Sequence, residues 1–420
     1  MLFRTPTRKE GIIAVLVGLC LVTIVGVAAI AIDGGLLLDQ RRRVQAAADA
    51  AALAAAADLY GRYPYNGGFD YDNKAQACAL SIATANGYSN DGTTNVVTVS
   101  VPPLTGDHVG QAGYAEVTVQ FNQPRGFSGI FGQGDIPVKA RAVAEGKWTY
   151  FQNGILLLDP TGEGSFHANG NGFAIVTGAG IVINSSDDQA AQAVGGGAGA
   201  SAPAFDITGI PGTNTASKFV GGAITSGVPP TPDPLSYLPA VDPSSLVIQA
   251  TDTVSVKGSM TLSSGWYKGG ISGTGGKWGD LLTLLPGVYY LGGVGWTDNS
   301  KVNVVGNGVM LYIALGAQLD LGGNGNLTLS PPTSGIYRGL TVFQDRSSTA
   351  EVKLHGNGTQ QISGTLYAAH ARFNMVGNGA TSQLGSQLIC WNLNLSGNGN
   401  INVNWFAQDT ARIRIIRLVE

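Results

Sequence analysis

Charged side chains are scarce in this 420-residue chain. Asp, Glu, Lys and Arg make up 12% of it, about half the share of an average soluble domain. The net charge is −3, so the sequence offers no basic surface for nucleic acid. The hydrophobic fraction of 44% is ordinary, and the chain therefore has enough apolar residues to fold around a core.

Cysteine and the usual catalytic motifs are also nearly or wholly missing. One of the three cysteines, Cys20, lies in an N-terminal apolar run, which leaves at most one intrachain disulfide, Cys78–Cys390, that a β-rich fold with a large core does not need. There is no H-E-x-x-H, G-x-S-x-G, P-loop or C-x-x-C motif. We therefore expect no catalytic, cofactor-binding or metal-binding residues and no enzyme activity.

Glycine, in contrast, is abundant, with 62 residues. Many glycines belong to a phrase of apolar, polar, apolar and any residue followed by Gly-Asn-Gly. Its copies are centred on Asn171, Asn307, Asn324, Asn357, Asn378 and Asn398. Alternation at period two indicates a strand with one buried face, and Gly-Asn-Gly is typical of a corner because Gly, and to a lesser degree Asn, tolerates positive φ.

The spacing of the copies favours a solenoid. From Asn307 onward the asparagines are 17, 33, 21 and 20 residues apart, and about 20 residues suit one coil of a parallel β-helix. The alternative is an antiparallel sandwich with glycine-rich hairpins. In a solenoid the six asparagines would form a structural ladder, and Asn357→Asp would cost about 2 kcal/mol by placing an unsatisfied group in the stack.

The N-terminus predicts a membrane anchor. Residues 12–32 carry no charge and would reach about 31 Å as a helix, the thickness of a bilayer core. A cleaved signal peptide ending at Ala29-Ile30-Ala31 is the alternative. Lys and Arg are balanced across the span, three against three. The export-like composition behind it favours a cytoplasmic tail at 1–11 and an ectodomain outside the cytoplasm.

The next segment, residues 36–60, contains neither Gly nor Pro and is rich in alanine, so it predicts a helix that ends at Gly61. Its small side chains allow another helix to approach closely. We expect Ala47, Ala51 and Ala54 to form a face that binds a partner's helix. The alternative is that this face packs only within its own domain.

These residues also carry a resemblance. Gly11 to Val15 leads into the span, Ala31-Ile32-Asp33-Gly34-Gly35 closes it, and Arg42 to Ala54 follows. This combination resembles the N-terminal segment of TadG-like proteins of Flp/Tad pilus assembly. The resemblance implies a small α+β, pseudopilin-like domain over 33–147. Leu16 stands where prepilin processing sites have Glu, which argues against peptidase cleavage at Gly11.

Within this small domain the sequence predicts a helix over 75–87, strands over 96–98 and 116–121, a short aromatic helix or turn over 127–131, and a strand over 136–144. Residues 148–420 predict the β-helix, with a proline-rich insertion at 228–243. The final strand, from Arg412 to Ile415, is expected to cap the open end of the solenoid.

Two further groups of residues are weighed as surface sites. Trp266, Tyr267, Trp278 and Trp296 would form either a sugar-binding platform or ordinary packing. Asp345 and Arg346 are expected to lie beside Lys353 and His355, as a surface salt-bridge cluster or as a catalytic group.

The sequence as a whole predicts a mainly β protein with an N-terminal transmembrane helix, a small α+β domain and a right-handed parallel β-helix. The resemblance implies a non-enzymatic structural or assembly role in a Flp/Tad-type pilus or related envelope system, in the inner membrane, with other envelope proteins as partners through the 36–60 helix. The alternative is a surface protein that binds or cleaves carbohydrate, with polysaccharide as its partner.

Overall fold

The computed structural model describes residues 8–130, 132–377, 382–398 and 400–420. The chain divides into two compact units. The N-terminal unit comprises Met1–Thr149 together with Arg414–Glu420, and the solenoid unit comprises Tyr150–Ile413. The N-terminal unit is therefore discontinuous in sequence, and the solenoid is inserted between two of its segments.

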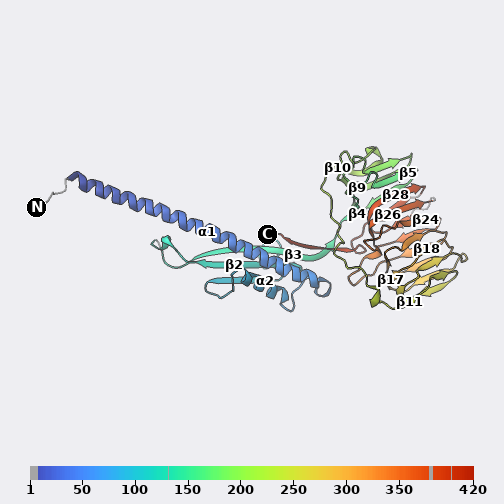
Figure 1. Cartoon of the computed structure of the whole chain (residues 1–420), viewed down its shortest axis with the longest axis horizontal. Helices are drawn as coiled ribbons and strands as arrows, with labels where there is room; N and C mark the ends of the chain where they lie inside the picture. The colour runs from blue at the N-terminus through green and yellow to red at the C-terminus, as the bar shows by residue number, and fades with distance from the viewer. Residues whose placement is uncertain (1–7, 131, 378–381, 399) are drawn as a thin grey trace. The chain divides into compact units, whose positions relative to one another are not determined.

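A single helix, α1, runs from Arg8 to Asn66 and joins the two expected helices into one (Figure 1). The expected end at Gly61 is wrong, because α1 continues past Pro64 into its last turn. Proline has no N–H to donate to the carbonyl four residues earlier. The indole Nε1 of Trp148 donates to that carbonyl, Tyr60 O, at 3.0 Å. A tertiary hydrogen bond thus replaces the helical one.

The rest of the N-terminal unit is a small α+β fold close to the one expected. Its elements are α2 (Lys74–Ala85), β1 (Asn95–Ser100), β2 (Tyr114–Gln123), η1 (Phe127–Ile130), β3 (Ile136–Tyr150) and β30 (Arg412–Leu418). The strands form one sheet in the order β1-β2-β3-β30, with antiparallel β1–β2 and β2–β3 pairs. The alanines of α1 and α2 and apolar residues of the sheet share one core.

The place of β30 corrects the sequence-based assignment. The strand was expected to cap the solenoid, but it extends the sheet of the N-terminal unit beside β3. The backbone N–H of Val143 in β3 donates to Glu420 O at 3.0 Å, and the N–H of Val419, just after β30, donates to Val143 O at 2.9 Å. The Arg141 guanidinium pairs with both Glu116 and Glu420, the last residue of the chain. These hydrogen bonds and ion pairs tie the C-terminus to β2 and β3.

The solenoid unit is a stack of parallel strands with about 11 turns, as the corner phrases predicted. Pairing divides its strands into three faces. The first face contains β11 (Ile248–Ala250), β14 (Gly265–Tyr267), β17 (Gly287–Leu291), β20 (Val309–Ile313), β23 (Leu340–Gln344), β26 (Thr365–Gly377), β28 (Gln387–Gly397), β4 (Asn153–Leu157), β7 (Gly180–Ile183), β9 (Gly199–Ile207) and β10 (Phe219–Ser226).

The long strands β26 and β28 also reach the second face, and β9 and β10 also reach the third. The second face adds β12 (Val254–Val256), β15 (Ile271–Gly273), β18 (Gly295–Asp298), β21 (Gln318–Leu321), β24 (Val352–Gly356), β5 (Phe166–Asn169) and β8 (Ala191–Val194). The third adds β13 (Met260–Leu262), β16 (Leu281–Leu284), β19 (Asn303–Gly306), β22 (Leu327–Leu329), β25 (Gln360–Ile362), β27 (Ser382–Leu384), β29 (Asn400–Asn404) and β6 (Phe173–Thr177).

The order of turns in the stack differs from the order in the chain. The chain enters the solenoid in the middle, at β4, and winds to one end at β10. It then restarts at the opposite end with β11 and winds back until β28 pairs with β4 and β5, and β29 pairs with β6. Figure 1 shows β10 and β11 at opposite ends of the stack.

This order requires a segment that returns along the outside, and the proline-rich insertion provides it. Eleven turns about 4.8 Å apart span about 50 Å, and an extended proline-rich chain of about 3.1 Å per residue covers this distance in about 16 residues. We call residues 227–247 the return segment. Its Leu235, Leu238 and Val241 are buried against outward side chains of the first face, including Tyr312 and Tyr367.

The side chain of Arg346, which follows β23, binds the backbone carbonyls of the return segment. Its guanidinium donates to Leu235 O at 2.6 Å and to Leu238 O at 2.8 Å. It also donates to the hydroxyl of Tyr367 at 2.8 Å and lies over the rings of Phe343 and Tyr367. An arginine satisfies several acceptors in one plane, which a lysine cannot do.

We predict that Arg346→Ala loosens the return segment. Removal of the guanidinium takes the donor away from two carbonyls, at a cost of about 1–3 kcal/mol. Hydrogen exchange of the full chain should show faster exchange over residues 231–241. The matched control is Arg372→Ala, because Arg372 is exposed and bonds only to Asn392 among the described residues. Equal exchange in both variants would contradict the role given to Arg346.

Candidate functional site

The first half of α1 presents apolar side chains to the surroundings. Those that are about half exposed or more are Ile13, Val15, Leu16, Val17, Leu19, Leu21, Val22, Ile24, Val25, Val27, Ile30, Ile32, Leu36 and Leu38. By length and composition, α1 qualifies as a candidate transmembrane helix near the N-terminus. A large exposed apolar surface on a helix is unfavourable in water and favourable in a bilayer.

Asp33 closes this apolar run and connects α1 to the loop between β2 and β3. Its Oδ1 accepts a hydrogen bond from the backbone N–H of Phe127 at 3.2 Å, and its side chain is buried. A Cβ added to Gly126 would lie 2.7 Å from the same oxygen, so glycine allows this close approach without a shift of the Asp33 side chain. The acidic residue at the expected membrane exit therefore fastens the helix to the folded unit.

The alanine face of α1 is occupied by its own unit. Ala47 and Ala51 are buried in the N-terminal core, and Ala54 is half-buried. In this structure α2 and the sheet cover Ala47 and Ala51, so a partner's helix would have to displace them to reach this face. On α2 the covered residues are Ala75, Ala79 and Ala83, at helical spacing. Small side chains on both helices allow the close approach, but within one chain.

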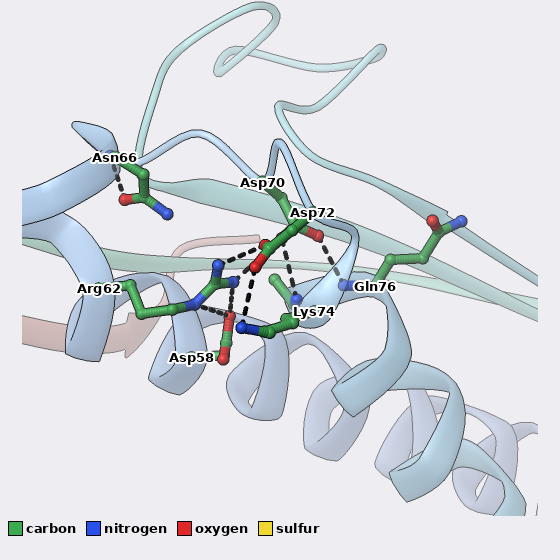
Figure 2. Close-up of polar contacts among 9 residues, drawn as sticks. Asp58, Arg62, Asn66, Asp70, Asp72, Lys74 and Gln76 are labelled. Atoms are coloured by element: carbon green, nitrogen blue, oxygen red, sulfur yellow. Dashed lines mark hydrogen bonds and ion pairs between the residues drawn. The ribbon is translucent and has the colours of Figure 1, made fainter.

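Beyond the alanine face, an ion-pair cluster around Arg62 joins the end of α1 to the start of α2 (Figure 2). The guanidinium pairs with Asp58, Asp70 and Asp72. Asp70 also accepts from the backbone N–H groups of Ala75 and Gln76, at 3.1 and 2.9 Å, and so caps α2. Contact with Lys74 and Arg62 lowers the pKa of Asp72 to about 2. All charges have partners, so the cluster is structural.

In the solenoid, the corner asparagines divide between two corners. Asn324, Asn357, Asn398 and Asn171 follow second-face strands that lie above one another. The N–H of Asn357 donates to Gly323 O, that of Asn398 to Gly377 O and that of Asn171 to Gly397 O. Asn378 belongs to the same phrase but lies outside the described residues. Each turn therefore continues the backbone ladder around this corner.

Asn307 is the exception, and the amide ladder differs from the expected one. Asn307 follows the third-face strand β19, and its Oδ1 accepts from the hydroxyl of Ser330 at 3.2 Å. In the second-face column, the side chains of Asn171 and Asn398 are bonded at 2.8 Å. Asn357 is exposed, so the loss of about 2 kcal/mol expected for Asn357→Asp lacks the burial on which it depended.

The glycines of the phrase have two separate roles. Gly356 has a φ of 105°, a conformation that favours glycine. At Gly358 a Cβ would lie 1.9 Å from the carbonyl oxygen of Gly325 in the adjacent turn, so glycine permits the close approach of turns. The corner asparagines that the structure describes do not take positive φ; among described non-glycine residues only Asn73 and Asn90 do.

A side-chain ladder that the sequence analysis missed lies on the second face itself. The amide of Asn394 donates to Asn374 Oδ1 at 2.9 Å, and Asn394 Oδ1 lies 2.9 Å from His167 Nδ1. These residues occupy the polar position between the two apolar residues of the phrase. Asn374 and Asn394 stand at that position in two successive copies of the phrase, and this repetition could have predicted the ladder from the sequence. The ladder assigns His167 a structural partner.

The remaining candidate residues do not assemble as expected. Asp345 accepts from the hydroxyl of Tyr312 at 2.8 Å, and His355 pairs with Asp320 at 2.7 Å, so the expected group of Asp345, Arg346, Lys353 and His355 is not formed. Lys353 instead faces Glu351. Cys78 and Cys390 are both free thiols.

The four aromatic residues considered as a sugar platform also lie apart. Trp296 and Tyr267 are buried in the solenoid core, whereas Trp278 is 68% exposed. Trp266 lies edge-on to Tyr290, with the Lys268 amino group 4.5 Å from its ring centroid. The packing alternative therefore holds for Trp296 and Tyr267, and no shared platform forms.

A cleft of about 420 Å³ lies instead between the return segment and the solenoid surface. It is lined by Leu158, Asn184, Pro230, Thr231, Pro232, Asp233, Ala369, His370 and Trp391. The rings of His370 and Trp391 lie 5.4 Å apart at a tilt of 32°. Asp233 is the one carboxylate among these lining residues, and it accepts a hydrogen bond from Tyr367. The cleft combines an aromatic wall with polar groups.

Comparison with known proteins identifies the N-terminal segment. Residues 11–58 match the family model for Flp pilus-assembly TadE/G-like proteins. This part of the chain is therefore similar to TadE/G-like proteins, and we call residues 11–58 the TadE/G-like segment. No curated protein and no solved structure matches the chain. The TadE/G-like segment lies wholly within α1 and contains the apolar run, Asp33 and the alanine face.

We predict that Ala51→Leu destabilises the N-terminal unit. Ala51 of α1 is fully buried against α2 and the sheet. Added methylene groups in a packed core cost about 1–3 kcal/mol. The measurement is hydrogen exchange of α2 and β2 in the full chain. Ala57→Leu is the matched control, because Ala57 is exposed on the same helix. Unchanged protection in Ala51→Leu would mean that the face is open to a partner after all.

Proposed function

We propose that this protein is a membrane-anchored, non-enzymatic structural or assembly component of a Flp/Tad-type pilus or a related cell-envelope surface system. The observation that supports it most is the TadE/G-like match over residues 11–58, on a helix long and apolar enough to span a membrane. The same helix continues without a break into the folded core. A continuous helix holds the folded core at a set distance from the membrane, which suits an assembly component.

The proposed topology is a single pass through the inner membrane, with the tail before Gly11 in the cytoplasm and everything after Asp33 outside it. The proposal includes no enzyme activity, because the sequence lacks the usual catalytic motifs. A partner that binds the 36–60 helix must use its exposed side, which includes Leu38 and Arg42, because the alanine side is covered.

Labelling of cysteines with a membrane-impermeant maleimide tests the topology. In a chain with its three native cysteines replaced, Tyr71→Cys should react in intact spheroplasts, because Tyr71 is exposed on the α1–α2 loop. Thr5→Cys should react only after permeabilisation. The opposite pattern would reverse the orientation, and recovery of the protein in the soluble fraction would overturn the anchor.

The assembly role needs a separate test. Crosslinking in native membranes should capture other Flp/Tad assembly proteins, and cells that lack this chain should lose surface pili. Normal pili in such cells, together with no captured assembly protein, would overturn the proposed role but not the membrane anchor.

The cleft at Trp391 favours carbohydrate binding as a second candidate function. Sugar rings stack on aromatic faces, and their hydroxyls bond to carboxylate, amide and imidazole groups. Cleavage is a weaker match, because glycoside hydrolysis uses two carboxyl groups about 5–9.5 Å apart, whereas Asp233 is the one carboxylate among the lining residues. Binding without cleavage would suit a surface protein that contacts envelope polysaccharide.

Calorimetry of the full chain in detergent, with cello-, malto- and chito-tetrasaccharides as probes, tests this candidate. Trp391→Ala should weaken binding about tenfold or more, which corresponds to about 1.4 kcal/mol. Trp278→Ala is the matched control, because Trp278 is exposed but does not line the cleft. No heat with any probe, or equal losses in both variants, would exclude the cleft as a site for these sugars.

A further inference from the structure

The loop between β2 and β3 is fixed beside the point where the apolar run of α1 ends. The hydrogen bond from Phe127 N–H to Asp33 holds it there. Leu36, Leu37 and Pro124 line a small cavity with Asp33 at the same place. A Cβ added to Gly126 would lie only 2.7 Å from Asp33 Oδ1, so the loop packs closely against α1 at this point.

The length of the exposed apolar surface sets the level of this loop in a bilayer. From Ile13 to Leu38, α1 presents exposed apolar side chains, and these 26 residues rise about 39 Å. The hydrocarbon core is about 30 Å thick, and the headgroups extend the bilayer to about 40–45 Å. The end of the apolar surface, from Asp33 to Leu38, therefore lies in the headgroup region, and so does the loop that contacts it.

The loop carries side chains suited to that region. The ring of Phe127 is 52% exposed although it is apolar. Aromatic side chains concentrate at the membrane interface. The exposed Arg125 uses Nε to donate to Gly134 O at 2.8 Å. Its remaining guanidinium N–H groups have the geometry that recognises phosphate.

We propose that this loop is a second membrane contact, in which Phe127 inserts into the lipid interface next to α1 and Arg125 faces lipid phosphate. The inference rests on the proposed insertion of α1 and goes beyond it. A lone helix leaves the folded unit free to tilt and rotate about its axis at the membrane. A second contact, fastened to the helix through Asp33, fixes the face that the N-terminal unit presents to the bilayer.

Photo-crosslinking to lipid tests the proposal on the full chain. Phe127 is replaced by the photoreactive analogue p-benzoyl-phenylalanine, the protein is placed in phosphatidylglycerol–phosphatidylethanolamine nanodiscs, and lipid adducts are detected by mass spectrometry. The same replacement at Val22, 70% exposed within the apolar run, is the positive control. Tyr71, 79% exposed, is the negative control, because it follows the far end of α1, about 50 Å along the helix from Asp33.

Lipid adducts at Val22 and Phe127 but not at Tyr71 are the expected result. Adducts at Val22 alone would overturn the loop proposal and leave the membrane anchor standing. Absence of adducts at Val22 would overturn the anchor itself. In native membranes, capture of a protein at Phe127 with no lipid adduct would identify the loop as a protein contact, which also overturns the proposal.

Discussion

The pairing of β28 with β4 and β5 is the constraint on which the solenoid depends. Leu388 and Ile389 lie opposite Ile155 and Leu156, and Leu393 lies opposite Phe166. This pairing closes the stack at a point where residues more than 200 apart in sequence meet. It also means that each half of the stack has one end already covered by the other half. Without it, two shorter solenoids would each expose an additional parallel edge.

The same pairing explains the return segment. A chain that enters a stack in the middle must cross its full length once, outside the hydrogen-bonded core. Proline suits such a segment because it favours an extended backbone. It also has no N–H to donate to a neighbouring strand, so the segment does not pair with the solenoid as an extra strand. The segment is held instead by buried leucines and by Arg346. The cleft beside Trp391 exists because the segment runs over the surface there.

In the N-terminal unit, small side chains allow helices and strands to pack at very short distances. A Cβ on Gly146 would lie 1.9 Å from the carbonyl oxygen of Ala56, so α1 rests almost directly on the backbone of β3. Alanine on α1 and α2 allows the two helices the same proximity. The TadE/G-like segment thus contains an apolar run and, immediately after it, a surface of small side chains that its own domain covers. This combination couples an anchor to a folded head through one uninterrupted helix.

Much of this architecture was accessible from the sequence. The uncharged run, the alanine helix, the small α+β elements and the parallel solenoid follow from local periodicity and composition, which act over a few residues. The continuation of α1 past Pro64 did not follow, because its lost hydrogen bond is replaced by Trp148, far away in the chain. The position of β30 did not follow either, because this strand could pair with the open end of the solenoid or with the edge strand β3 of the N-terminal unit, and its sequence suits both.

The Gly-Asn-Gly phrase shows the same division within one motif. Its repetition determined that turns stack, and its glycines permit the close approach of adjacent backbones. It did not determine that Asn307 lies at a different corner from Asn324. In the same way, the alanine spacing of α1 did not determine that Ala51 faces its own sheet. A sequence pattern fixes which side of an element is apolar or small, because that depends on the spacing of side chains. Which surface covers that side depends on contacts between distant segments, and only the tertiary structure decides it.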